Sequence, residues 1–284
     1  MPAPPSDNTA SLNVVLVGEE SAGAQTLKLL AQSQHRVAGV LAAPPQPARG
    51  SATVWQLAGQ LGYRRWPAEL VKDAAFAEVL RAEGVDLLLN VHSLYLIAPA
   101  VIAAPRYGSF NLHPGPLPRY AGLNAVSWAI YRGETAHGVT LHKLEPGIDT
   151  GPLVFQTLFP LGEQDTALAV YTKCIRAGVV LLERLLDLAA RDPLAIPLTP
   201  QDLSQREYFG KGAPNEGRIQ WARPAREIYN WVRACNYFPF PSPWGHPRAR
   251  LAGQELALTQ VRLSHRLPEV LPEVLLDGAR LTEG

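Results

Sequence analysis

The stretch that decides the fold is Leu12-Asn-Val-Val-Leu-Val-Gly18, close to the amino end of the chain. It is a run of β-branched and other apolar residues that ends at a glycine. A run without polar alternation is typical of a strand buried on both faces, as in a parallel sheet. Apolar residues at helical spacing follow from Ser21 to Gln32, and Arg36 to Ala42 has the pattern of a second strand. The sequence therefore predicts a β-α-β opening.

The glycines of this opening, Gly18 and Gly23, do not form the G-x-G-x-x-G pattern of dinucleotide-binding turns. The predicted second strand also has no acidic residue at its end that could hold a ribose. A tight turn between strand and helix is sufficient to explain both glycines, so we do not expect a dinucleotide site.

Strand-like and helix-like segments alternate through the next part of the chain. We predict strands over 63–66, 85–90, 108–112, 139–142 and 153–156, and helices over 54–61, 74–83, 99–104 and 166–191. This alternation predicts an α/β fold, Rossmann-like and doubly wound, with a mostly parallel sheet.

A second unit is expected after a linker. Residues 192–205 are rich in proline and polar residues and resemble an interdomain linker. Beyond it, short strands are predicted over 219–221 and 256–261, with a helix over 227–234. We therefore expect a catalytic domain over residues 1–195 and a small C-terminal domain over 205–284.

Composition restricts the classes of function. The net charge of the 284 residues is only +1, which does not suggest avid binding to a nucleic acid. The two cysteines, Cys174 and Cys235, have no metal-ligand spacing, and we expect reduced, buried thiols and no metal site. Residues 1–10 lack the features of a signal peptide, and no apolar run reaches the roughly 20 residues of a membrane span. We expect a cytoplasmic protein that does not bind a membrane.

The densest group of candidate functional residues is Phe110-Asn-Leu-His-Pro-Gly-Pro-Leu-Pro-Arg-Tyr-Ala-Gly122. On a strand, the spacing of Asn111 and His113 places both side chains on one face. They would emerge at the carboxyl end of the strand, where open α/β sheets bind ligands. The prolines that follow stiffen the loop and would hold the two side chains in place.

A second loop, Leu144-Glu-Pro-Gly-Ile-Asp-Thr-Gly151, contributes a carboxylate, Asp149. An Asn, a His and an Asp together suit acyl transfer. The amide of Asn111 can donate to a developing oxyanion, His113 can move protons near neutral pH, and Asp149 can stabilise the imidazolium. No serine or cysteine nucleophile is needed if the attacking group is an amine of the substrate. A single histidine at a strand end is usually an ordinary polar residue, so it is the combination that points to a site.

These motifs resemble those of the folate-dependent formyltransferase family. The resemblance rests on Asn111-Leu-His113 with Leu117-Pro118 and Gly122, then on Gly138-Val-Thr-Leu-His142, then on Gly147-Ile-Asp149-Thr-Gly151. It extends more weakly to Gly217–Trp221 and Ile228–Ala234, which resemble the start of the OB-like β domain that follows in the family. The donor implied is 10-formyltetrahydrofolate, a co-substrate, with no metal.

The resemblance also implies roles for individual residues. Asn111 would steady the oxyanion, His113 would transfer the proton, and Asp149 would support the protonated histidine. The pterin would be held by backbone atoms of two loops, whose residues here are Tyr95, Leu96, Ile97, Glu145, Pro146, Gly147 and Ile148. Three positions depart from the pattern: Gly115 replaces a common serine, Pro116-Leu-Pro118 replaces the usual L-L-P, and Leu123 stands where one family member has an arginine that meets the folate tail.

The acceptor is less constrained by the sequence. For tRNA we would expect basic residues near 43–50 and a basic C-terminal domain, but 43–50 holds only Arg49, and residues 205–284 have 11 Lys or Arg against 8 Asp or Glu. We therefore expect a small-molecule amine, either a nucleotide-linked amino sugar or an amino-acid amine. A tRNA acceptor (methionyl-tRNA formyltransferase) and hydrolysis of 10-formyltetrahydrofolate stay open as alternatives.

Three segments are the candidates for contacts with that acceptor: 43–50, 123–127 and the aromatic loop Tyr237–Gly245. The aromatic loop could equally serve as a hydrophobic plug between domains. We expect no nucleic-acid partner apart from that tRNA alternative, and a homodimer is the oligomer that we consider.

Overall fold

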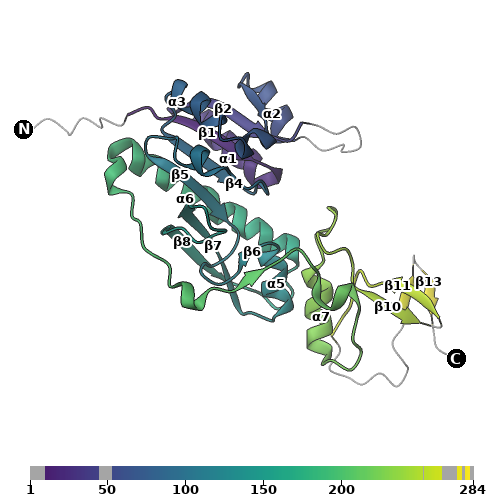
Figure 1. Ribbon diagram of the computed structural model, residues 1–284. Coiled ribbons are helices and arrows are strands. Elements are labelled where there is room, and N and C mark those ends of the chain that lie inside the picture. The colour runs from purple at the N-terminus through teal and green to yellow at the C-terminus, as the bar shows by residue number, and fades with distance from the viewer. Residues whose placement is uncertain (1–9, 45–52, 252, 264–273, 277–278, 282–284) are drawn as a thin grey trace, which may run out of the picture.

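The computed structural model describes residues 10–44, 53–251, 253–263, 274–276 and 279–281. Its centre is a seven-stranded sheet in the order β3-β2-β1-β4-β5-β7-β8 (Figure 1). The strands are β1 (Asn13–Gly18), β2 (Arg36–Ala42), β3 (Arg65–Pro67), β4 (Leu87–Val91), β5 (Gly108–His113), β7 (Ala136–Lys143) and β8 (Leu153–Pro160). The first five strands of that order are parallel, while β7 and β8 are antiparallel to their neighbours. The predicted mostly parallel sheet is confirmed.

Helices cover both faces of this sheet, as expected for a doubly wound fold. They are α1 (Glu20–Gln32), α2 (Val54–Gln60), α3 (Phe76–Ala82), α4 (Pro99–Ile102), α5 (Ala125–Tyr131) and α6 (Ala167–Arg191). One hydrophobic core contains residues of α1, α2, α5 and α6, and a second contains residues of α3 and α4.

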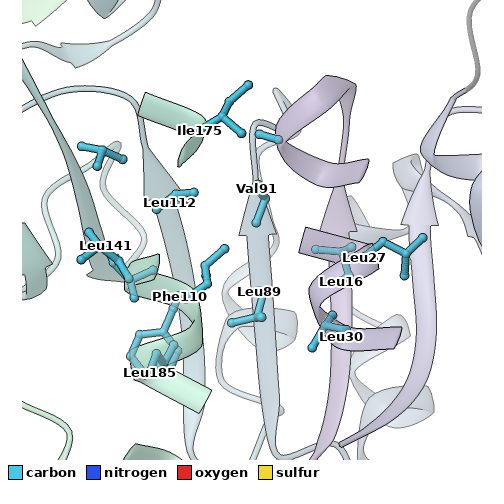
Figure 2. Close-up of a cluster of buried hydrophobic side chains, with 14 of the residues drawn as sticks. Leu16, Leu27, Leu30, Leu89, Val91, Phe110, Leu112, Leu141, Ile175 and Leu185 are labelled. Carbon is cyan, nitrogen blue, oxygen red and sulfur yellow. The ribbon is translucent and has the colours of Figure 1, made fainter. Parts of the chain in front are cut away.

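The apolar runs of the central strands explain this architecture. In β1 every residue after Asn13 is buried, and β4 is buried throughout, so both faces of these strands lie in cores. Figure 2 shows Leu16 and Leu89 from neighbouring strands beside Leu27 and Leu30 of α1. Burial of each such side chain contributes about 1.5–3 kcal/mol to the free energy of folding.

The turn between β1 and α1 depends on Gly23. A Cβ atom at this position would lie 2.8 Å from the backbone carbon of Gly18 and 3.1 Å from its Cα atom. The glycine thus permits close packing of the helix on the strand, which agrees with a structural reason for both glycines.

The C-terminal part is small and contains antiparallel strand pairs. Helix α7 (Ala225–Ala234) packs against α5. The hairpins β10 (Arg248–Leu251) with β11 (Gln254–Ala257), and β12 (Val274–Leu276) with β13 (Ala279–Leu281), lie beyond α7, away from the large sheet (Figure 1).

Three predicted strands are wrong in position or in kind. Residues 219–221 form no strand, because only Arg218 bridges to Arg248 before the chain turns toward Pro224, the N-cap of α7. The strand predicted at 256–261 is β11, which ends at Ala257 because its partner β10 begins opposite at Arg248. The strand predicted at 63–66 is shifted to Arg65–Pro67, where it pairs with the end of β2.

Two further features concern the whole chain. Cys174 and Cys235 are free and buried, as predicted. None of the helices formed by the described residues has the length and apolar character needed to cross a bilayer.

Candidate active site

The site begins on β5, which places Asn111 and His113 at its carboxyl end. The two side chains lie on one face of the strand, as their spacing predicts, and His113 is almost fully buried. Strand β5 lies between β4, which is parallel to it, and β7, which is antiparallel. Side chains from both neighbours can therefore reach the two residues.

The loop after β7 brings Asp149 to the same point. Its Oδ2 atom lies 3.5 Å from Nδ1 of His113, and its Oδ1 atom accepts a 3.4 Å hydrogen bond from the amide of Asn111. The backbone N–H of Gly122 also donates to Oδ2, at 2.8 Å. The structure thus brings together the three predicted catalytic residues.

The electrostatics of this cluster favour the ionised carboxylate. Burial acts to raise the pKa of Asp149, but the charge of His113, the neighbouring His142 and the N–H of Gly122 outweigh it. The pKa of Asp149 is therefore held well below its usual range. Asp149 also has a left-handed backbone, with φ of 54°, which is rare for a residue other than glycine.

Both ring nitrogens of His113 face protein groups. Nε2 donates to the carbonyl oxygen of Tyr120 at 2.7 Å, so Nδ1 is the atom that faces Asp149. Gly115 allows the ring of His113 to take this position, because a Cβ atom on residue 115 would lie 2.8 Å from Nε2 of His113. The glycine that departs from the family pattern is therefore matched to the orientation of the histidine.

Two polar residues that the sequence reasoning missed fix the orientation of the Asn111 amide. Asn90, on β4, donates from Nδ2 to Oδ1 of Asn111 at 2.8 Å. His142, on β7, donates from Nδ1 to the carbonyl of Lys143 at 2.9 Å, and its Nε2 atom lies 3.0 Å from the amide nitrogen of Asn111 and 3.4 Å from Oδ1 of Asp149. Both contacts turn the Asn111 amide nitrogen toward the side of His142 and Asp149.

The segment predicted to be a linker also contacts the site. Gln201 donates from Nε2 to the carbonyl oxygens of Asp149 at 2.9 Å and Gly151 at 2.6 Å. Arg206, the residue just beyond that segment, donates to the carbonyl of Ile148 at 3.0 Å. These contacts brace the loop that carries Asp149, and the sequence pattern gives no signal for them.

A short strand holds the loop after His113 in a similar way. β9 (Tyr208–Phe209) pairs with β6 (Ala121–Gly122) in the loop after His113. The preceding residue, Glu207, accepts from Nε of Arg119 at 3.0 Å and lies 3.1 Å from Arg132. Both catalytic loops are thus held by residues beyond position 200.

The two loops predicted to hold the donor lie against one hydrophobic cluster, to which Tyr95, Ile97 and Leu144 contribute. Leu96 is 70% exposed and Ile148 is 42% exposed, so apolar side chains of both loops face solvent. A hollow of roughly 640 Å³ is lined by Leu94, Leu96, Ile97, Ala98, Pro99 and Lys72. Among the predicted contacts, Glu145, Pro146 and Gly147 are exposed beside Ile148.

The aromatic loop after α7 is divided between packing and exposure. Tyr237 forms a 3.0 Å hydrogen bond with Ser127, and Trp244 packs edge-on against Trp128 with 4.8 Å between ring centroids. Phe238 and Phe240 are exposed. Of the other acceptor candidates, 123–127 leads into α5 and contacts this loop through Ser127, whereas most of 43–50 falls outside the described residues. Within the described ranges, no group of His, Cys, Asp or Glu side chains is arranged to hold a metal ion.

The sequence matches two family models. Residues 7–186 match the model described as formyl transferase, and residues 212–270 match the model of a formyl transferase C-terminal domain. A methionyl-tRNA formyltransferase from Sinorhizobium fredii is 31% identical over 240 residues, which cover 82% of this chain and 76% of that protein.

Solved structures with the same fold include two relatives of low sequence identity. A 4-N formyltransferase from Francisella tularensis superposes with a TM-score of 0.69 at 16% identity, covering 89% of this chain and 99% of that one. An N-formyltransferase from Helicobacter canadensis, in complex with folinic acid and dTDP-3-aminofucose, gives a TM-score of 0.60 at 19% identity, covering 78% and 80%. At such identities the likeness concerns the fold alone.

Proposed function

Since the chain belongs to the formyl transferase family and is an N-formyltransferase, we propose that its donor is 10-formyltetrahydrofolate and its acceptor the primary amine of a small molecule. A nucleotide-linked amino sugar or an amino-acid amine is the acceptor class. The observation that carries the proposal is the meeting of Asn111, His113 and Asp149 at the carboxyl end of β5.

The reaction requires an oxyanion donor and a route for one proton. The amine nitrogen attacks the formyl carbon, and a C–N bond forms while the carbonyl oxygen becomes negative. Asn111 donates to that oxygen by giving up its longer contact, the 3.4 Å bond to Asp149. The bond from the formyl carbon to N10 of the folate then breaks, and the formyl amide and tetrahydrofolate leave.

The proton lost by the amine is the one that N10 gains, and we assign its transfer to His113. Because Nε2 of His113 is occupied by the Tyr120 carbonyl, the exchanged proton is the one on Nδ1, shared with Asp149 at 3.5 Å. The ionised Asp149 stabilises the imidazolium while the histidine holds that proton.

The loops 95–97 and 145–148 fit a folate donor. Leu96 and Ile148 each expose an apolar side chain that a pterin ring would cover, and Lys72 places a cation in the hollow lined by Leu96, where folate carboxylates could pair with it. The folinic acid held by the Helicobacter canadensis protein supports a donor of this chemistry. We also keep the division into residues 1–195 and 205–284 as a proposal.

The acceptor has one specific competitor. The 31% identity to a methionyl-tRNA formyltransferase favours charged initiator tRNA. Against it stands the net charge of +1, since proteins that bind RNA tightly usually present a strongly basic face.

The test is a panel of acceptors with labelled formyl donor: dTDP-3-aminofucose, an amino-acid amide and initiator methionyl-tRNA. We expect label in a small amine and none in the tRNA, with donor consumed only when an amine is present. Label in the tRNA would move the acceptor to that class. Formate released without any amine would indicate a hydrolase, and an unchanged rate in His113→Ala would refute the proposed machinery.

A further inference from the structure

A network of hydrogen bonds among Glu20, Tyr171 and His92 lies at the carboxyl ends of β1 and β4, and the proposed mechanism does not use it. The hydroxyl of Tyr171, on α6, donates to Oε2 of Glu20, at the start of α1. The same hydroxyl lies 2.7 Å from Nδ1 of His92, the residue after β4. The sheet order changes direction between β1 and β4, and such switch points are where open α/β sheets bind ligands.

The hydrogen bonds among Glu20, Tyr171 and His92 determine the tautomer of His92. The single hydroxyl proton of Tyr171 goes to Glu20, because a carboxylate can only accept. The hydroxyl oxygen must therefore accept from Nδ1–H of His92. A neutral ring with its proton on Nδ1 has a lone pair on Nε2, and this atom is buried without a hydrogen-bond partner within the described part of the chain. A buried acceptor without a donor is costly unless a ligand supplies one.

The two outer residues of this network, Glu20 and His92, both have a strained backbone conformation. Glu20 has φ of 55° and His92 has φ of 54°, in the left-handed region that residues other than glycine rarely adopt. Such outliers persist where the surrounding structure fixes them, and they are concentrated at functional sites.

The network of Glu20, Tyr171 and His92 lies beside the candidate active site. His92 follows β4, and β4 pairs with β5, which carries Asn111 and His113. Burial, and to a smaller extent the charge of His113, lowers the pKa of His92 to about 4. The His92 ring is therefore neutral at pH 7, when it accepts a hydrogen bond but is too weak a base to keep a proton.

We propose that Nε2 of His92 accepts a hydrogen bond from the attacking amine of the formyl acceptor, with Tyr171 and Glu20 as positioning residues that fix the ring. This inference rests on the proposed formyl transfer. The carboxylate of Glu20 also makes this switch point suited to an amine or ammonium group rather than to a phosphate at the start of α1. Tyr237 of the aromatic loop packs edge-on against Tyr171, 6.3 Å between centroids, so the rest of the acceptor would extend toward that loop.

The kinetic test compares His92→Phe and Tyr171→Phe with the unaltered chain, using dTDP-3-aminofucose, the amino-acid amide and initiator methionyl-tRNA as acceptors. Loss of the hydrogen bond in His92→Phe should raise KM for the amine about tenfold and leave KM for 10-formyltetrahydrofolate unchanged. Tyr171→Phe should raise KM for the amine less, because the His92 ring remains but is no longer held by the Tyr171 hydroxyl. The control is His35→Gln, in the turn before β2, at the amino ends of the parallel strands, whereas His92 follows the carboxyl end of β4.

A second measurement needs no known acceptor. Nitrogen-15 NMR of histidine-labelled full-length protein should show His92 as the Nδ1–H tautomer, assigned by the loss of its signals in His92→Phe. Titration with methylammonium chloride should shift the Nε2 resonance of His92 but not that of His35.

The outcomes separate the inference from the proposed function. An Nε2–H tautomer, or formyl transfer with an unchanged amine KM in His92→Phe, would overturn the role of His92 and leave formyl transfer standing. Absence of transfer to every amine would overturn the proposed function, and the methylammonium titration would then decide alone whether His92 binds amines.

Discussion

Acid should destabilise this protein through a buried histidine on β7. His137 is 1% exposed, Nε2 donates to the carbonyl of Pro114 at 3.0 Å, and Nδ1 is buried without a partner within the described residues. Burial lowers the pKa of His137 from 6.5 to about 4, although the bond to Pro114 acts to raise it. A proton on this ring would be a charge in the core.

The sign and size of the effect follow from that pKa. The ring takes up a proton near pH 6.5 in the unfolded chain but only near pH 4 in the folded one, so acidification favours unfolding. The contribution is complete above pH 6.5 and is lost as the pH falls toward 4. The full difference corresponds to about 3.4 kcal/mol, of which about 2 kcal/mol is lost by pH 5. His92, whose pKa is also about 4, should contribute a similar loss.

The assay is urea unfolding at pH 8 and pH 5, followed by circular dichroism. The unaltered chain should lose about 4 kcal/mol of unfolding free energy between the two pH values from these two rings, and His137→Phe should lose about 2 kcal/mol. Phenylalanine keeps the ring volume and removes the titrating group. Equal losses in the two proteins would show that His137 does not titrate as its burial implies.

Three further predictions concern the site and the core. Asn111→Ala should lower kcat about 10²- to 10³-fold in steady-state assays, and a loss confined to donor affinity would contradict its role at the oxyanion. Gln201→Ala should lower kcat about tenfold at unchanged thermal midpoint, since it removes two bonds to the Asp149 loop, whereas Gln205→Ala, which loses only an exposed bond to Asp202, should be neutral. Leu185→Ala, inside the core beneath β5 (Figure 2), should cost about 2–5 kcal/mol of unfolding free energy, and a loss below 1 kcal/mol would mean that the core closes over the gap.

The sequence was informative wherever the decisive pattern is local. The apolar run Val14–Val17 of β1 predicts burial on both faces, and the spacing of Asn111 and His113 predicts a shared face. Gln201 and Arg206 were missed because each bonds a loop more than 50 positions away. Nothing in a proline-rich polar segment indicates such partners. His92 and Tyr171 are 79 positions apart, and only the packing of α6 against the sheet brings them together.

The bonds from Gln201, Arg206 and β9 to the catalytic loops bear on how this chain could be recombined with others. A break at residue 195 would keep every strand of the large sheet but would remove the groups that hold the Asp149 loop and the loop after His113. A chimera that keeps a working first half must therefore carry residues through Phe209. Insertions between 199 and 209 should be selected against, even though most of that stretch lies on the surface.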